Sequence, residues 1–186
     1  EGTFTYAGGV LSAFDSTVVR IETDEGVTGW GECAPLGPAY LPAYAEGVRT
    51  GLQHLAPHLI GADPTALTAI NETMDALLKG HPYVKSAIDM ACWDVLGRTA
   101  GLPLATLMGG TRGEGVLLYR AVSQDSADTM ARRVREYQEA GYRRFQLKLG
   151  DRPEIDIGRV GAIAGALRVG DALIADANGG WLAHEA

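Results

Sequence analysis

Two stretches near the end of the sequence alternate between apolar and polar side chains, which predicts two β-strands. In RFQLKLG, residues 144–150, the apolar side chains share one face and the polar ones, ending with Lys148, share the other. ALIADAN, residues 172–178, alternates in the same way and places Asp176 and Asn178 on one face. Each predicted strand therefore ends with a polar group that can carry chemistry.

Polar residues on these strands are unexpected, because buried parallel strands are usually apolar on both faces. In an α/β barrel, functional residues gather at the carboxyl ends of the strands, where Lys148 and Asp176 lie in this pattern. The two groups can then face one small cavity. On these two strands alone, a salt bridge at the mouth of a barrel is the simpler interpretation.

From residue 116 onward the pattern predicts strands alternating with helices. Strands are expected at 116–122, 144–150 and 172–178, and helices at 126–140 and 153–167. This order is typical of parallel strands joined by right-handed crossovers. We therefore place the chain in the α/β class, with domains at residues 1–112 and 113–186.

The first domain begins differently, with a pattern typical of an α+β fold. We expect a Gly-rich loop over residues 1–14, then a hairpin whose strands span 17–23 and 27–32. Helical spacing then predicts helices at 43–55, 64–79, 83–97 and 104–108, and Asp63 is a candidate cap for the second of them.

The segment CAPLGPAYLP, residues 33–42, joins the hairpin to the first helix. Its three prolines and one glycine predict a shaped loop, and Tyr40 is its one large aromatic side chain. Tyr40 can either pack over the hairpin or serve as an aromatic group of a binding loop. The pattern by itself favours neither.

Composition narrows the classes of partner. The chain has 186 residues, of which 46% are hydrophobic and 21% charged, with a net charge of −7, so neither nucleic acid nor an anionic membrane is expected to bind. No apolar run approaches the roughly 20 residues of a membrane span, and two cysteines without metal-ligand spacing leave a cytoplasmic location as the default. The chain begins without Met or a signal peptide and stops where a helix is expected. Both ends therefore look truncated, and we expect a longer protein.

Four motifs carry a resemblance to a known family. They are AIDMACWDVLGRTAGLPLATLMGG at 87–110, GWGE at 29–32, LKLG at 147–150 and DAN at 176–178. With these motifs the chain resembles the mandelate racemase/muconate lactonizing family of the enolase superfamily. The resemblance implies an α+β capping domain followed by part of a modified (β/α) TIM-like barrel, which is incomplete here.

The resemblance also implies roles for individual residues. Lys148 matches the base that moves a proton α to a carboxylate, and Asp176 matches a ligand of Mg²⁺, which stabilises the resulting enolate. Gln146 stands where the family often has a second lysine and is a candidate for substrate binding. Asn178 is a candidate hydrogen-bonding partner of the substrate, although a loop-capping role before two glycines fits it at least as well. The family places further acidic metal ligands and another lysine on later barrel strands, and these have no counterpart in these residues.

Two loops resemble those of proteins that act on proline derivatives. They are ECAPLGPAYLP at 32–42 and GHPYVKSAID at 80–89, and the proteins are proline-betaine racemases, hydroxyproline-betaine epimerases and cis-3-hydroxyproline dehydratases. Tyr40 would then contact a quaternary ammonium group through a cation–π interaction. The implied function is a Mg²⁺-dependent racemase or epimerase acting on a small carboxylate, in a homo-oligomer.

Two alternatives stay open. The first is a lyase of the same fold, dehydrating hydroxyproline or a sugar acid, because its first step is identical. The second is an inactive fragment or a non-catalytic binding protein, because only three barrel strands are predicted, where a closed barrel of this kind has eight. We accordingly expect the 186 residues alone to be inactive.

Overall fold

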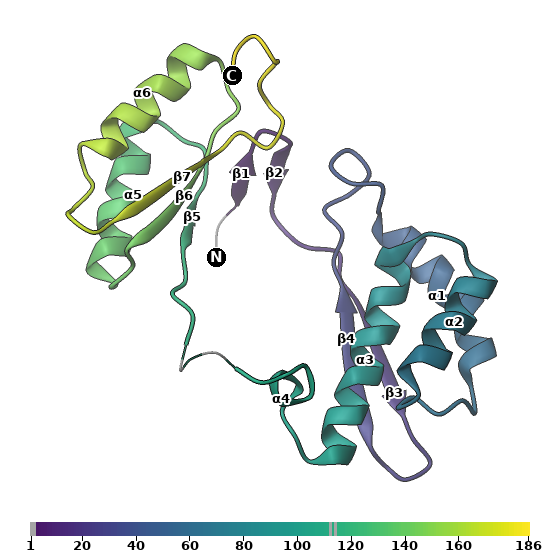
Figure 1. Ribbon diagram of the computed structural model, residues 1–186. Helices are drawn as coiled ribbons and strands as arrows, with labels where there is room; N and C mark the ends of the chain where they lie inside the picture. The colour runs from purple at the N-terminus through teal and green to yellow at the C-terminus, as the bar shows by residue number, and fades with distance from the viewer. Residues whose placement is uncertain (1–2, 112, 114) are drawn as a thin grey trace. The chain divides into compact units, whose positions relative to one another are not determined.

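The structure is a computed structural model that describes residues 3–111, 113 and 115–186. The chain forms two compact units (Figure 1). One is Phe14–Glu114, and the other joins Glu1–Ala13 to Gly115–Ala186. The short segment before residue 14 thus groups with the later strands, whereas the sequence order had suggested a single division at residue 112.

In the unit Phe14–Glu114, an antiparallel hairpin packs against helices. The hairpin consists of β3 (Thr17–Glu22) and β4 (Thr28–Cys33), and the helices are α1 (Ala45–Leu59), α2 (Leu67–Leu77), α3 (Pro82–Ala100) and α4 (Leu104–Leu107). Helix α3 lies along β4 (Figure 1). The contact is close because β4 carries Gly29 and Gly31, where a Cβ atom would stand 2.3 Å and 1.9 Å from carbonyl oxygens of α3.

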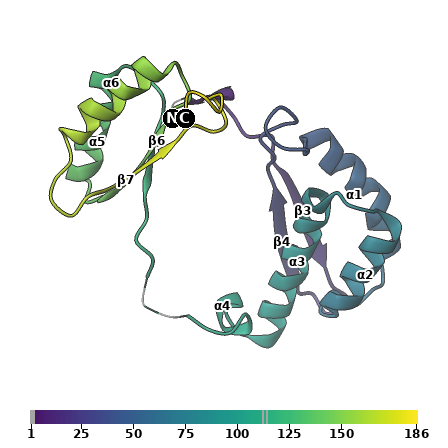
Figure 2. The same cartoon turned by 45° about the horizontal axis from the view of Figure 1, so that its top comes forward.

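The second unit holds a parallel three-stranded sheet in the order β5-β6-β7. Its strands are β5 (Arg120–Val122), β6 (Arg144–Lys148) and β7 (Ala172–Asp176), connected by α5 (Ala127–Glu139) and α6 (Pro153–Ala164). The two helices lie side by side on one face of the sheet (Figures 1 and 2). The strand–helix alternation predicted for this region is confirmed.

The two faces of β6 have different roles. Phe145, Leu147 and Leu149 are at most 1% exposed and pack against α5 and α6, and burying each such side chain contributes about 1.5–3 kcal/mol. Lys148 therefore lies on the face that the helices do not cover, as the alternation of the sequence predicted. Ser126 caps α5 by accepting a hydrogen bond from the backbone N–H of Thr129 at 3.3 Å.

Three local predictions were wrong. Residues 4–11 form a hairpin of β1 (Phe4–Tyr6) and β2 (Gly9–Leu11) and not a loop. The strand expected from residue 116 begins only at Arg120, and residues 116–119 are exposed. Asp63 does not cap α2, because its carboxylate accepts the backbone N–H of Thr65 at 2.8 Å and so closes a turn before the helix.

No helix in the described residues is long and apolar enough to cross a membrane.

Candidate active site

Lys148 and Asp176 end two adjacent parallel strands. They are direct partners in the register between β6 and β7, so their side chains project to the same side of the sheet. The ammonium Nζ of Lys148 donates to Oδ2 of Asp176 at 2.7 Å. The two groups that the sequence placed at strand ends therefore meet.

Gln146 and Asn178 complete the surroundings of this carboxylate. Gln146, on the same face of β6, donates its side-chain N–H to Oδ2 of Asp176 at 2.9 Å. The backbone N–H of Asn178 donates to the other oxygen, Oδ1, also at 2.9 Å. Asn178 adopts a φ of 49°, a left-handed conformation that asparagine tolerates better than most residues. Gln146 through its side chain and Asn178 through its backbone thus both contact Asp176.

The hydrogen bond from Lys148 holds the pKa of Asp176 below its ordinary value. Burial opposes this shift, and the hydrogen bond from the Asn178 backbone reinforces it. The carboxylate is therefore ionised at neutral pH. The side chains of Lys148 and Asp176 are 11% and 25% exposed, so the pair is sheltered but still reachable.

An aromatic ring that sequence reasoning missed lies next to the pair. The Nζ atom of Lys148 is 5.7 Å from the centroid of the Phe4 ring, which belongs to β1. Phe4 stacks on Tyr6 with 6.1 Å between ring centroids. The alternation of aromatic residues at positions 4 and 6 was the available signal for a strand, but the surrounding glycines favoured a loop.

Tyr40, the remaining candidate, belongs to the unit Phe14–Glu114. It lies in a turn in which its backbone N–H donates to the carbonyl oxygen of Gly37 at 3.1 Å, and its side chain is 40% exposed. Its contact with a substrate held by Lys148 and Asp176 stays a prediction.

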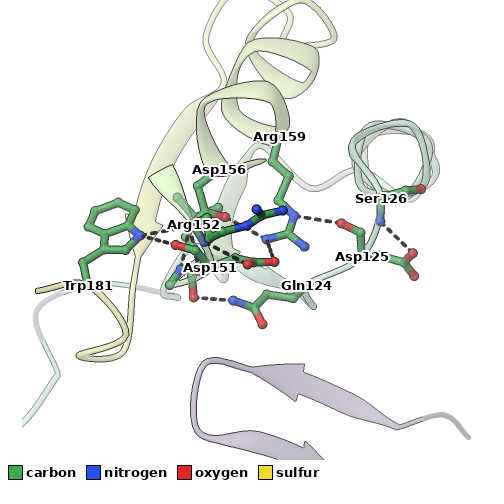
Figure 3. Close-up of polar contacts among 10 residues, drawn as sticks. Gln124, Asp125, Ser126, Asp151, Arg152, Asp156, Arg159 and Trp181 are labelled. Carbon is green, nitrogen blue, oxygen red and sulfur yellow. Dashed lines mark hydrogen bonds and ion pairs between the residues drawn. The ribbon is translucent and has the colours of Figure 1, made fainter. Parts of the chain in front are cut away.

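A partly buried polar network lies in the loops that follow the strands (Figure 3). Its centre is Asp156 in the first turn of α6, which is 2% exposed. Burial alone would raise the pKa of Asp156. Hydrogen bonds from Arg159, Trp181 and the backbone N–H groups of Gly150 and Asp151 outweigh burial and hold that pKa below its ordinary value.

This lowered pKa predicts a loss of stability in acid. The ionised Asp156 stabilises the fold above its unfolded-state pKa, and this contribution disappears as the pH falls through the lower folded-state pKa. Between pH 7 and pH 3 the free energy of unfolding should therefore fall less in Asp156→Asn than in the original chain, as measured by urea denaturation. Glu154→Gln, an exposed carboxyl of the same helix, is the control. If the free energy of unfolding falls equally with pH in Asp156→Asn and in the original chain, the prediction is contradicted.

One residue of the site, Asp176, has the donor atoms that a divalent metal ion prefers. A carboxylate such as Asp176 is the hard oxygen ligand that Mg²⁺ prefers. Within residues 3–111, 113 and 115–186, no group of three or more His, Cys, Asp or Glu side chains could hold a metal ion. Among these residues, Asp176 can therefore offer such a cation one carboxylate ligand without forming a complete site.

The apolar cavity of the other unit offers no comparable chemistry. It has a volume of about 520 Å³ and lies between β3 and the helices α1 to α3. The thiol of Cys92 in its lining is buried, and burial raises the pKa of this thiol to about 11. The thiol is thus protonated at neutral pH and unsuited to nucleophilic chemistry.

Two family models together match most of the chain. The model for the N-terminal domain of mandelate racemase/muconate lactonizing enzyme matches residues 4–109. The model for the enolase C-terminal domain-like fold matches residues 129–186.

Alignments with individual relatives cover nearly the whole of this chain. It is 54% identical to a cis-3-hydroxy-L-proline dehydratase from Roseibium aggregatum, covering 100% of this chain and 51% of that protein. It is 35% identical to a hydrophobic dipeptide epimerase from Enterococcus faecalis, covering 99% of this chain and 51% of that protein. The chain thus spans about half the length of these curated relatives.

Solved structures resemble it closely. A dipeptide epimerase from Enterococcus faecalis, complexed with Mg and the dipeptide L-Leu-L-Tyr, matches with a TM-score of 0.92 and 34% identity, over 100% of this chain and 52% of that one. A member of the enolase superfamily from Roseovarius nubinhibens, complexed with magnesium, matches with a TM-score of 0.86 and 43% identity, over 98% of this chain and 52% of that one.

Proposed function

Because this chain belongs to the mandelate racemase/muconate lactonizing enzyme family of the enolase superfamily, we propose that it supplies the base and one metal ligand of an enzyme that removes the proton α to a carboxylate. The observation that carries the proposal is the 2.7 Å pair of Lys148 and Asp176 at the ends of neighbouring strands. The family also defines the architecture, an N-terminal capping domain and the first part of a (β/α) barrel domain.

Lys148 is the proposed general base. Its amine accepts the α-proton once it is unprotonated, and it lies on the open face of β6 beside the Phe4 ring. The ring centroid lies 5.7 Å from Nζ, a distance at which an aromatic face attracts a cation. Gln146 keeps the Asp176 carboxylate oriented through its 2.9 Å hydrogen bond, and its polar group is also available to a bound substrate.

Asp176 is the proposed ligand of a divalent cation, most simply Mg²⁺, which related solved structures contain. When bound, such a cation stabilises the negative charge that develops on the substrate carboxylate as the α-proton leaves. The contribution of this chain is to hold Asp176 ionised, with Oδ1 fixed by the backbone of Asn178.

The substrate class that we propose is a proline derivative. The identity of 54% to a cis-3-hydroxy-L-proline dehydratase supports a hydroxyproline, and the loop at 32–42 supports the same class. In a dehydration, Lys148 takes the α-proton, the electron pair of the broken C–H bond forms a carbon–carbon double bond, and the C–O bond to the β-hydroxyl breaks. The departing hydroxide takes up a proton from solvent and leaves as water, and Lys148 returns its proton to solvent before the next turnover.

Racemisation or epimerisation is the second candidate outcome, and the epimerases among the relatives favour it. In that case the proton returns to the opposite face of the α-carbon and nothing leaves. For a betaine substrate, Tyr40 is the proposed aromatic partner of the quaternary ammonium, in a contact of about 0.5–2 kcal/mol.

One experiment separates the two outcomes. The full-length protein that carries this chain is incubated in D₂O with Mg²⁺ and either cis-3-hydroxy-L-proline or proline betaine. We expect hydroxyproline to lose one water by mass spectrometry. Deuterium gain at the α-carbon of either compound, without loss of water, would instead assign a racemase or epimerase. Failure of every proline derivative tested to react or to exchange would contradict the proposal.

A further inference from the structure

The loops that follow β6 and β7 extend the two strand ends that carry the proposed site. One loop begins at Leu149, directly after Lys148, and the other begins at Ala177, directly after Asp176. The backbone N–H of Leu149 donates to the carbonyl oxygen of Asp176 at 2.9 Å, which is the last hydrogen bond between the strands. The hydrogen bonding between the strands therefore ends one residue beyond Lys148 and Asp176, and from that point the two loops carry the contact.

The two loops touch backbone to backbone. A Cβ atom at Gly180 would stand 2.5 Å from the carbonyl oxygen of Gly150, and one at Gly150 would stand 2.4 Å from that of Ala177. Side chains essentially never approach so closely. The loops are thus in direct contact only because both positions are glycine.

Side chains then fasten the same two loops together (Figure 3). The Oδ2 atom of Asp156 accepts the backbone N–H groups of Gly150 at 2.8 Å and Asp151 at 2.9 Å. The indole N–H of Trp181, from the loop after β7, points to the same oxygen at 3.0 Å and to the carbonyl oxygen of Asp151 at 3.2 Å. One buried carboxylate oxygen therefore binds both loops.

Arg159 extends the fastening to a third loop, the one after β5. Its guanidinium donates to Oδ1 of Asp156 at 2.8 Å and, through Nε, to the carbonyl oxygen of Asp125 at 2.8 Å. From the same loop, the side-chain N–H of Gln124 reaches the carbonyl oxygen of Leu149. Arg159 is 9% exposed and Asp156 2% exposed, so these bonds are shielded from water.

We propose that Asp156 and Trp181 are positioning residues, which hold the loop after β6 against the loop after β7 and so set the distance between Lys148 and Asp176. The inference rests on the function proposed above. Neither residue touches the reacting groups in the described structure. They act through the backbone of residues 149–151 and 177–180.

The most selective test is Trp181→Phe, which keeps an aromatic ring and removes only the indole N–H. The matched control is Trp30→Phe, a half-exposed tryptophan on β4 in the other unit. Both variants are made in the full-length protein. Initial rates with Mg²⁺ and cis-3-hydroxy-L-proline give kcat and KM, and thermal denaturation gives stability.

We expect Trp181→Phe to lower kcat about tenfold with little change in KM. A misplacement of about 1 Å costs about 100-fold in rate, and the loss of one hydrogen-bond donor should move the strand ends by less than that. The melting temperature of Trp181→Phe should stay within about 3 °C of the original, and Trp30→Phe should leave kcat unchanged. Unchanged kcat in Trp181→Phe would overturn the proposal, as would a fall in kcat that merely follows a loss of folded protein.

Hydrogen–deuterium exchange supplies a readout that does not need turnover. The amides of Gly150 and Asp151 should exchange faster in Trp181→Phe, and faster still in Asp156→Asn, while amides of α5 keep their protection. Equal exchange in all variants would refute the fastening of the loops by Asp156 and Trp181, even if the enzyme is active. If the original protein has no activity but shows the expected exchange pattern, the proposed function and the positioning of its reacting groups by Asp156 and Trp181 would both be overturned, and only the fastening of the loops would remain.

Discussion

Replacing Lys148 with methionine in the full-length protein should lower kcat about 10²–10⁴-fold, the usual contribution of a general acid or base. Methionine has a similar unbranched length and can pack beside Phe4, so the site should keep its shape. Asp176 would retain the hydrogen bonds from Gln146 and from the backbone of Asn178. The loss would therefore report the missing amine and not a collapsed site.

The chain contains a close control for this variant. Lys85 pairs with Asp75 at 2.6 Å, and its side chain is 12% exposed, against 11% for Lys148. It lies in the unit Phe14–Glu114, and Lys85→Met should change kcat by less than about twofold. The measurement is single-turnover loss of the substrate α-proton, with circular dichroism as a check on folding. A Lys148→Met enzyme with more than a tenth of the original rate would exclude this lysine as the base.

Replacing Gly150 with alanine should lower the free energy of unfolding by about 2–4 kcal/mol and abolish most activity. Two costs add. The φ of +102° is unfavourable for any residue with a Cβ, at about 1–3 kcal/mol. The new Cβ would also meet the carbonyl oxygen of Ala177 at 2.4 Å, so that the loops after β6 and β7 must separate.

Gly158→Ala provides the opposite expectation in the same unit. Gly158 lies within α6, and among the described atoms none would be within 4 Å of its Cβ apart from its own helix backbone and chain neighbours. Alanine there should stabilise the fold by about 0.5–1 kcal/mol, since it forms helices better than glycine. Urea denaturation of both variants measures the difference. A Gly150→Ala protein as stable as the original would contradict the close contact of the loops.

The part of the site built on strands could be predicted from the sequence. Alternation along a strand is a strict period of two, so the faces of Lys148 and Asp176 follow directly from the apolar positions between them. Parallel pairing then brings the strand ends together, and the 2.7 Å contact agrees with that expectation.

The part built on loops and short strands could not be predicted. β1 and β2 have three residues each, among glycines, so the alternation of Phe4 and Tyr6 is too short to outweigh the loop signal. Their place is set by contacts distant in sequence, such as the hydrogen bond from the backbone N–H of Gln124 to the carbonyl oxygen of Thr5 at 3.0 Å. The pairing of Asp156 with Trp181 joins residues that are 25 positions apart. In the sequence, the first looks like an ordinary acid in the first turn of a helix and the second like a loop aromatic.

Glycine contact between neighbouring loops also limits how such enzymes can be recombined. Gly150 and Gly180 are in backbone contact, so that neither leaves room for a side chain at the other. A recombination point placed between β6 and β7 would therefore pair loops that had not been selected together. A donor segment with any larger residue at either position would force the two strand ends apart in the chimera. Swaps that transfer residues 149–181 as one cassette should preserve the geometry, and this makes the strand pair, and not the single βα repeat, the unit in which variation is tolerated.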